Sequence, residues 1–82
     1  MRVDRGDFVV FVTTHALIRA ARRGFGWDEI EGVIRTGEFR RLKNGRINIE
    51  KQSSSGKVTC VGIIFRPGKM KIITIERNEV WR

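Results

Sequence analysis

The chain runs Phe8-Val9-Val10-Phe11-Val12 and continues directly into Thr13-Thr14-His15-Ala16-Leu17-Ile18-Arg19-Ala20-Ala21-Arg22-Arg23-Gly24. The first part is an unbroken apolar run rich in β-branched residues, which predicts a strand. A hydroxyl of Thr13 or Thr14 is a favourable N-cap, so we expect a helix from His15 to Arg23. Gly24 is a common residue just beyond a helix C-terminus and predicts the end of this helix.

A second helix is expected soon after this glycine. It begins near Trp27 and ends before Gly37, and its apolar residues recur at helical spacing on one face. Asp28 and Glu29 fall in its first turn, where negative charge suits the positive end of the helix dipole. Two consecutive helices are therefore expected in the first half of the chain.

The second half of the chain has the pattern of strands. Asn44-Gly45 favours positive φ at both residues and predicts a tight type I′ hairpin. Pro67-Gly68 predicts a second turn. On the last strand, we expect Met70, Ile72 and Thr74 to share one face. The strands of this half are expected at Phe39–Lys43, Arg46–Glu50, Lys57–Arg66 and Lys69–Arg77.

Taken in order, these elements predict an α+β fold in which two N-terminal helices pack on an antiparallel sheet of four to five strands. Its 82 residues suit a single domain, residues 1–82. The lone Cys60 excludes an internal disulfide or a cysteine metal cluster and favours a reducing, cytoplasmic setting. No apolar run approaches the roughly 20 residues of a membrane span. No motif for a metal or cofactor is present, so none is expected.

Charge is the most informative part of the composition. The chain has 17 Lys and Arg against nine Asp and Glu, which gives a net charge of +8. Twelve of the 17 are Arg, whose planar guanidinium pairs bidentately with phosphate. This excess favours a nucleic acid or an acidic protein as the partner.

The first helix concentrates this charge on one side. At 100° per residue, His15, Arg19, Arg22 and Arg23 fall within an arc of about 100°, and apolar residues fill the rest. Three guanidinium groups beside one imidazole can hold phosphate and exchange a proton. A polar surface residue or a helix cap is the alternative interpretation of His15.

A second group of cations lies on the predicted hairpin. These side chains suit either contact with a phosphate backbone or a charged edge strand that resists aggregation. Arg77, at the end of the last strand, could reach the same cleft as the first helix. The hairpin group consists of Arg40, Arg41, Lys43, Arg46 and Lys51.

Residues 13–25 resemble the pattern H-A-x-x-R-x-x-x-R-G followed by an apolar residue, which opens a family of short microbial chains known as a domain of unknown function. The resemblance continues through Trp27–Ile34 and Thr36-Gly37-Glu38 and resumes at Ile72–Ile75. Such chains are similar to RelE-type toxins, within the broad group of barnase, EndoU, colicin and RelE ribonucleases. That group implies helices on a curved antiparallel sheet.

The resemblance implies metal-independent RNA cleavage, in which the 2′-hydroxyl attacks the adjacent phosphorus and leaves a 2′,3′-cyclic phosphate. His15 then corresponds to the acid-base group, Arg19 and Arg23 to phosphate clamps, and Thr74 to a strand threonine of the family. Two features depart from the pattern. Ala20 stands where the family has a bulky apolar residue, and no second acid or base can be placed.

The partners expected from this interpretation are RNA, whether free or on the ribosome, and a small acidic antitoxin protein. Arg22, Arg40, Arg41, Lys43, Arg46 and Arg77 are the expected RNA-binding residues. Two other functions compete with cleavage. The chain could be a non-catalytic module that binds nucleic acid, or a protein-interaction domain whose basic face docks an acidic partner.

Overall fold

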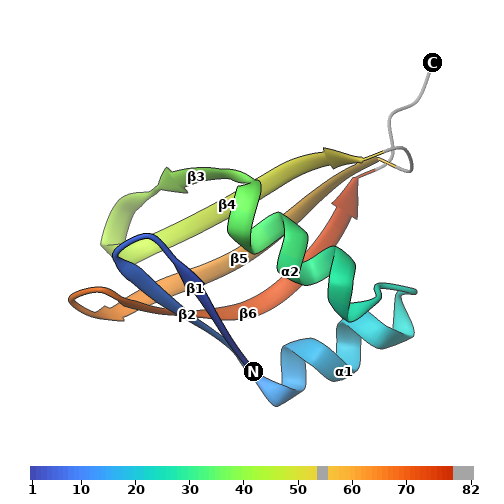
Figure 1. The fold of residues 1–82 in the computed structure, drawn as a ribbon, viewed down its shortest axis with the longest axis horizontal. Helices are drawn as coiled ribbons and strands as arrows, with labels where there is room; N and C mark the ends of the chain where they lie inside the picture. The colour runs from blue at the N-terminus through green and yellow to red at the C-terminus, as the bar shows by residue number, and fades with distance from the viewer. Residues whose placement is uncertain (54–55, 79–82) are drawn as a thin grey trace.

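The computed structural model describes residues 1–53 and 56–78, which form two helices and six strands (Figure 1). The helices are α1 (Thr14–Arg22) and α2 (Trp27–Thr36), and a short 3₁₀ turn, η1, covers Lys43–Gly45. The strands are β1 (Arg2–Arg5), β2 (Phe8–Val12), β3 (Glu38–Arg41), β4 (Arg46–Ser53), β5 (Gly56–Arg66) and β6 (Lys69–Asn78).

The strands form one mixed sheet in the order β1-β2-β6-β5-β4-β3, and this sheet curls into a half-barrel. The curl brings strands from opposite ends of this order together. The ring of Phe8 on β2 stacks on that of Phe39 on β3 with 5.4 Å between centroids. Arg5 on β1 lies over the same Phe39 ring and donates a hydrogen bond of 2.9 Å to the carbonyl of Ile34 in α2.

The α+β class is confirmed, but the expected sheet is wrong in two respects. It has six strands instead of four or five, because Arg2–Arg5 forms an additional edge strand paired with β2. It is mixed instead of antiparallel, because β2 pairs in parallel with β6. The helices follow the β1–β2 hairpin and connect β2 to β3 at the opposite edge of the sheet, so that β6 returns beside β2 only after β3, β4 and β5.

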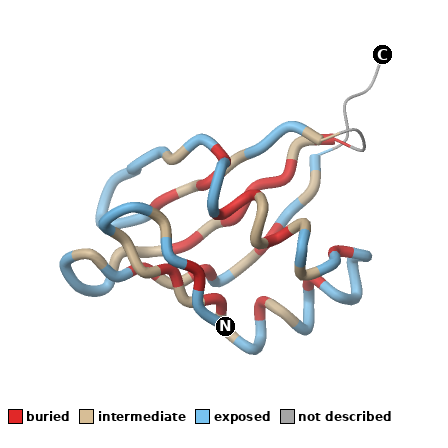
Figure 2. The backbone as a smooth tube through the Cα atoms, in the orientation of Figure 1, coloured by how far each residue is buried: buried red, intermediate tan, exposed pale blue. Residues whose placement is uncertain are grey.

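The hydrophobic core combines buried residues of the helices and of the sheet, and Figure 2 marks the buried positions on both. α2 packs against β1, β4 and β5, and α1 packs against β6. The core is mostly aliphatic, with Cys60 fully enclosed among these side chains. None of the helices in the described part of the chain is long and apolar enough to cross a membrane.

The predicted hairpin turn is confirmed with one extra residue. Asn44 and Gly45 both have positive φ, 61° and 75°. The Arg46 N–H donates to the Lys43 carbonyl, whereas the Arg46 carbonyl accepts from Leu42. One strand therefore carries an additional residue, as in a β-bulge.

A second bulge changes which residues of β6 face the core. Val61 pairs with Thr74, and Gly62 pairs with Ile72, so Ile73 has no partner across the ladder. The alternation shifts at this point, and Ile75 joins Ile72 in the core. The expectation that Thr74 shares a face with Ile72 is therefore wrong, since Thr74 points to the opposite face of the sheet.

Candidate functional site

The site begins with the exposed side of α1. Thr13 is the N-cap, and its hydroxyl accepts a hydrogen bond of 3.1 Å from the Ala16 N–H. Ala16 and Ala20 face the core, which turns the other side of the helix to solvent. Small buried residues let the helix lie close to β6 while its long polar side chains stay outside.

His15, Arg19 and Arg22 are all exposed on this outer side. Among the described residues, no carboxylate pairs with any of them, and His15 has no hydrogen-bond partner. The helical rise places the backbones of His15 and Arg19 about 6 Å apart. We call these three residues with Arg23 the α1 cluster.

Arg23 is held more firmly than the other members. The helix ends in a Schellman arrangement, with the Phe25 N–H bonded to the Ala20 carbonyl at 3.0 Å and Gly24 at φ 86°. Phe25 is buried, and this fixes the direction of the chain after α1. The Arg23 side chain then reaches β6, where Nη1 donates to the Ile75 carbonyl at 2.8 Å.

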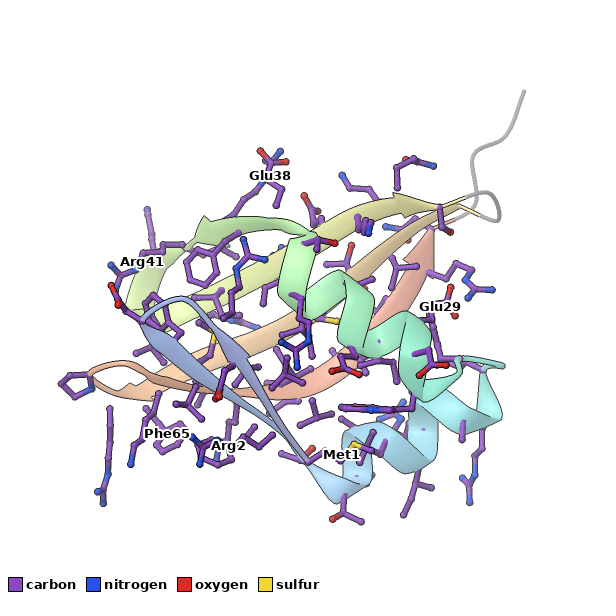
Figure 3. The ribbon with its side chains drawn as sticks, in the orientation of Figure 1. Met1, Arg2, Glu29, Glu38, Arg41 and Phe65 are labelled. Atoms are coloured by element: carbon purple, nitrogen blue, oxygen red, sulfur yellow. The ribbon has the colours of Figure 1, made fainter. Side chains whose placement is uncertain are left out.

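Arg77 lies close to the same end of α1, but its charge is already paired. Its Nη2 contacts both carboxylate oxygens of Glu29, at 2.9 and 2.8 Å, and its guanidinium lies 4.5 Å from the centroid of the Phe25 ring. Figure 3 labels Glu29, which α2 contributes. A hollow of about 470 Å³ adjoins this group, lined by Arg23, Phe25, Glu76, Arg77 and Asn78.

Thr74 is not joined to the α1 cluster by any hydrogen bond of the described residues. Its side chain lies on the sheet face opposite Ile75, beside Val61 on β5. The two ends of α1 are instead bonded to backbone carbonyls of β6: the Thr13 N–H donates to the Ile72 carbonyl at 3.3 Å, and the Arg23 side chain donates to the Ile75 carbonyl.

The hairpin cations lie elsewhere. β3 and β4 are at the far end of the strand order from β2, and Figure 1 shows their connecting turn away from α1. Arg40 is paired with Glu38 at 3.3 Å and with Glu50 at 3.2 Å. Lys51 donates to the Thr36 hydroxyl. Three hairpin cations are exposed with no carboxylate partner among the described residues: Arg41, Lys43 and Arg46.

The structure therefore separates two basic regions that the sequence could not place relative to each other. It also adds Glu29, which sequence reasoning treated only as a helix-dipole residue. The acidic first turn of α2 was the only signal in the sequence. Glu29 and Arg77 are 48 positions apart, so the sequence does not show that they form a pair. Within residues 1–53 and 56–78, no group of His, Cys, Asp and Glu is arranged to hold a metal ion.

No family model matches the chain, and neither a curated protein nor a solved structure does so. The resemblance to RelE-type toxins consequently stays a prediction. What the site offers by itself is one solvent-exposed imidazole one helical turn from Arg19, with no carboxylate paired to either side chain among the described residues.

Proposed function

We propose that the chain is a metal-independent ribonuclease whose α1 cluster binds and cleaves RNA. The observation that carries the proposal is the exposed His15–Arg19 pair with no carboxylate partner among the described residues. An unpaired guanidinium beside an imidazole provides both charge for a phosphate and a group that accepts a proton.

In this mechanism, His15 takes the proton from the ribose 2′-hydroxyl as the oxygen attacks the adjacent phosphorus. Arg19 neutralises the negative charge that develops on the phosphoryl oxygens. Arg23 lies about 12 Å from His15 along the helix, so Arg22 and Arg23 suit the neighbouring phosphate better than the reacting one. The 5′-oxygen leaves with a proton from imidazolium or from water, and a 2′,3′-cyclic phosphate remains.

The test compares cleavage of mixed single-stranded RNA in EDTA, with detection of 2′,3′-cyclic ends. We expect His15→Ala and Arg19→Gln each to lower the cleavage rate by about a hundredfold or more. Arg35→Gln is the matched control, because Arg35 is an exposed arginine on α2 that pairs with Glu31 instead. Cleavage by His15→Ala at the wild-type rate would contradict the proposal.

A second candidate function is a non-catalytic module that binds nucleic acid. It is favoured by one observation: no hydrogen bond among the described residues links His15 to a second acid or base. This function predicts salt-sensitive RNA binding that His15→Ala leaves unchanged, with no cyclic phosphate formed. Binding restricted to an acidic, antitoxin-like protein would instead assign the cations to a protein interface.

A further inference from the structure

One face of the sheet points away from the helices. Along β6, the buried Met70 and Ile72 alternate with Lys71 and Ile73, which point the other way. No helix or strand of the described residues packs over that second face. We call it the open face.

The strand registers place apolar and cationic side chains in one row across the open face. Arg2 pairs with Phe11, Phe11 with Lys71, Lys71 with Ile63, and Ile63 with Arg46. The row therefore alternates cation and apolar group over five adjacent strands. With strands about 4.8 Å apart, successive cations lie roughly 10 Å from one another.

Two aromatic rings lie next to each other on this face. Phe11 and Phe65 lie 6.1 Å apart between centroids, with their planes tilted by 50°. The Lys71 ammonium lies 5.9 Å from the centroid of Phe65. Phe65 is 43% exposed and Ile73 is 39% exposed. Figure 3 draws Phe65 and Arg2 on the same side, at the lower left of the view.

The charged side chains in this row are all cations, and most of them have no ion-pair partner among the described residues. Lys71 and Arg46 have no carboxylate partner among the described residues, and Arg2 makes only a surface ion pair with Asp4. Glu50, which also lies on this face, is held by Arg40 and Lys57. An uncharged apolar partner would bury these cations unpaired, at a large desolvation cost. A polyanion with flat aromatic groups would satisfy both kinds of side chain.

We propose that the open face binds unpaired, single-stranded RNA, with bases stacked on Phe11 and Phe65 and phosphates paired with Lys71 and Arg46. Stacking on exposed aromatic rings requires bases that are free of a duplex. The identity of the polyanion as RNA rests on the proposed function. The new element is a second surface, outside the α1 cluster, that selects single strands.

The experiment measures binding of a 2′-O-methyl oligonucleotide, single-stranded or in a duplex, by fluorescence anisotropy. This ligand has no free 2′-hydroxyl and cannot be cleaved by the proposed reaction, so binding is measured independently of catalysis. We expect the single strand to bind at least tenfold more tightly than the duplex. Phe65→Leu should weaken single-strand binding by about tenfold, and Phe65→Trp should retain it.

Lys71→Gln and Arg35→Gln form a matched pair, since both remove one positive charge but only Lys71 lies on the open face, whereas Arg35 pairs with Glu31 on α2. Lys71→Gln should weaken binding and reduce its salt dependence, whereas Arg35→Gln should change affinity by less than twofold. Equal affinity for duplex and single strand, or unchanged binding by Phe65→Leu, overturns the inference. So does a wild-type dimer that Phe65→Arg dissociates, because the face would then belong to a second copy. Each of these results leaves the cleavage test with His15→Ala unaffected.

Discussion

At the scale of single residues, Arg77 is a cation that the net charge counts as free to bind a ligand, although the fold pairs it with a carboxylate. Its guanidinium is held by Glu29 and covers Phe25, and its side chain is only 26% exposed. Truncation therefore removes an ion pair and a ring contact together, while little free charge is lost from the surface. Arg77 is better described as a support for the end of α1 than as an RNA-binding residue.

We accordingly expect Arg77→Ala to lower the free energy of unfolding by about 1–3 kcal/mol, because Glu29 loses its partner in a half-buried setting. RNA affinity should fall by less than twofold. Urea denaturation followed by tryptophan fluorescence and an RNA titration measure the two quantities. A tenfold loss of RNA affinity with unchanged stability would show instead that the Arg77 charge faces the ligand.

Cys60 is governed by burial. Desolvation raises the pKa of its thiol to about 12, so the group stays protonated throughout the physiological range. The contribution of this group to stability is thus complete below the unfolded pKa of about 9 and is lost as the pH rises towards 12.

At pH 8, Ellman's reagent should leave the thiol of Cys60 in the native protein unlabelled and modify one thiol per chain in urea. Rapid labelling of the native protein would mean that the core opens locally around β5.

At the scale of elements, two glycines of α2 have opposite roles: Gly32 lies inside the helix and Gly37 is its C-cap. A Cβ on Gly37 would lie 2.5 Å from the Val33 carbonyl oxygen and 2.7 Å from that of Glu50, whereas a Cβ on Gly32 would meet nothing within 4 Å. Gly37 therefore allows the helix end to approach β4, and Gly32 only adds flexibility.

Gly37→Ala should destabilise the protein by about 2 kcal/mol or more, since backbone atoms must move. Gly32→Ala should stabilise it by about 0.5–1 kcal/mol, because alanine is the better helix former. Urea denaturation of both variants provides the comparison, with each serving as the control for the other. Equal effects of the two substitutions would contradict the close approach of α2 and β4.

The elements that the sequence predicted correctly are those specified by local patterns. α1, α2, the Asn44-Gly45 turn and the long β5 and β6 strands follow from caps, periodicity and turn residues. β1 was missed because only Val3 among its four residues is buried, so the segment has no apolar alternation to detect. The Ile73 bulge was missed because it depends on a ladder partner and not on the local sequence.

The same distinction applies to the candidate site. The alignment of His15 with Arg19 and Arg22 could be predicted, because helical spacing alone determines it. The pairing of Arg40 with Glu50, and of Arg77 with Glu29, could not, since each pair is made across elements. Sequence counts therefore overestimate the free positive charge near each basic region.

At the scale of the whole molecule, the parallel pairing of β2 with β6 determines where the two basic regions lie. α1 starts at the end of β2 and continues along β6, whereas the β3–β4 hairpin closes the other side of the sheet (Figure 1). The molecule measures 39 Å along its longest axis. A bound RNA strand that contacts both regions must run over much of this length.

This separation predicts a dependence on RNA length. Lys43→Gln, in the hairpin turn, should leave the affinity for a four-nucleotide RNA unchanged. It should lower the affinity for a twenty-nucleotide RNA several-fold, because only the longer strand reaches the turn. Arg22→Gln, on α1, should lower the affinity for both RNAs to a similar extent. Anisotropy titrations of the four combinations at one salt concentration give the result. An equal loss of affinity for the short and the long RNA in Lys43→Gln would contradict this prediction. The hairpin and α1 would then have to bind the same few nucleotides, which the arrangement of the strands does not allow.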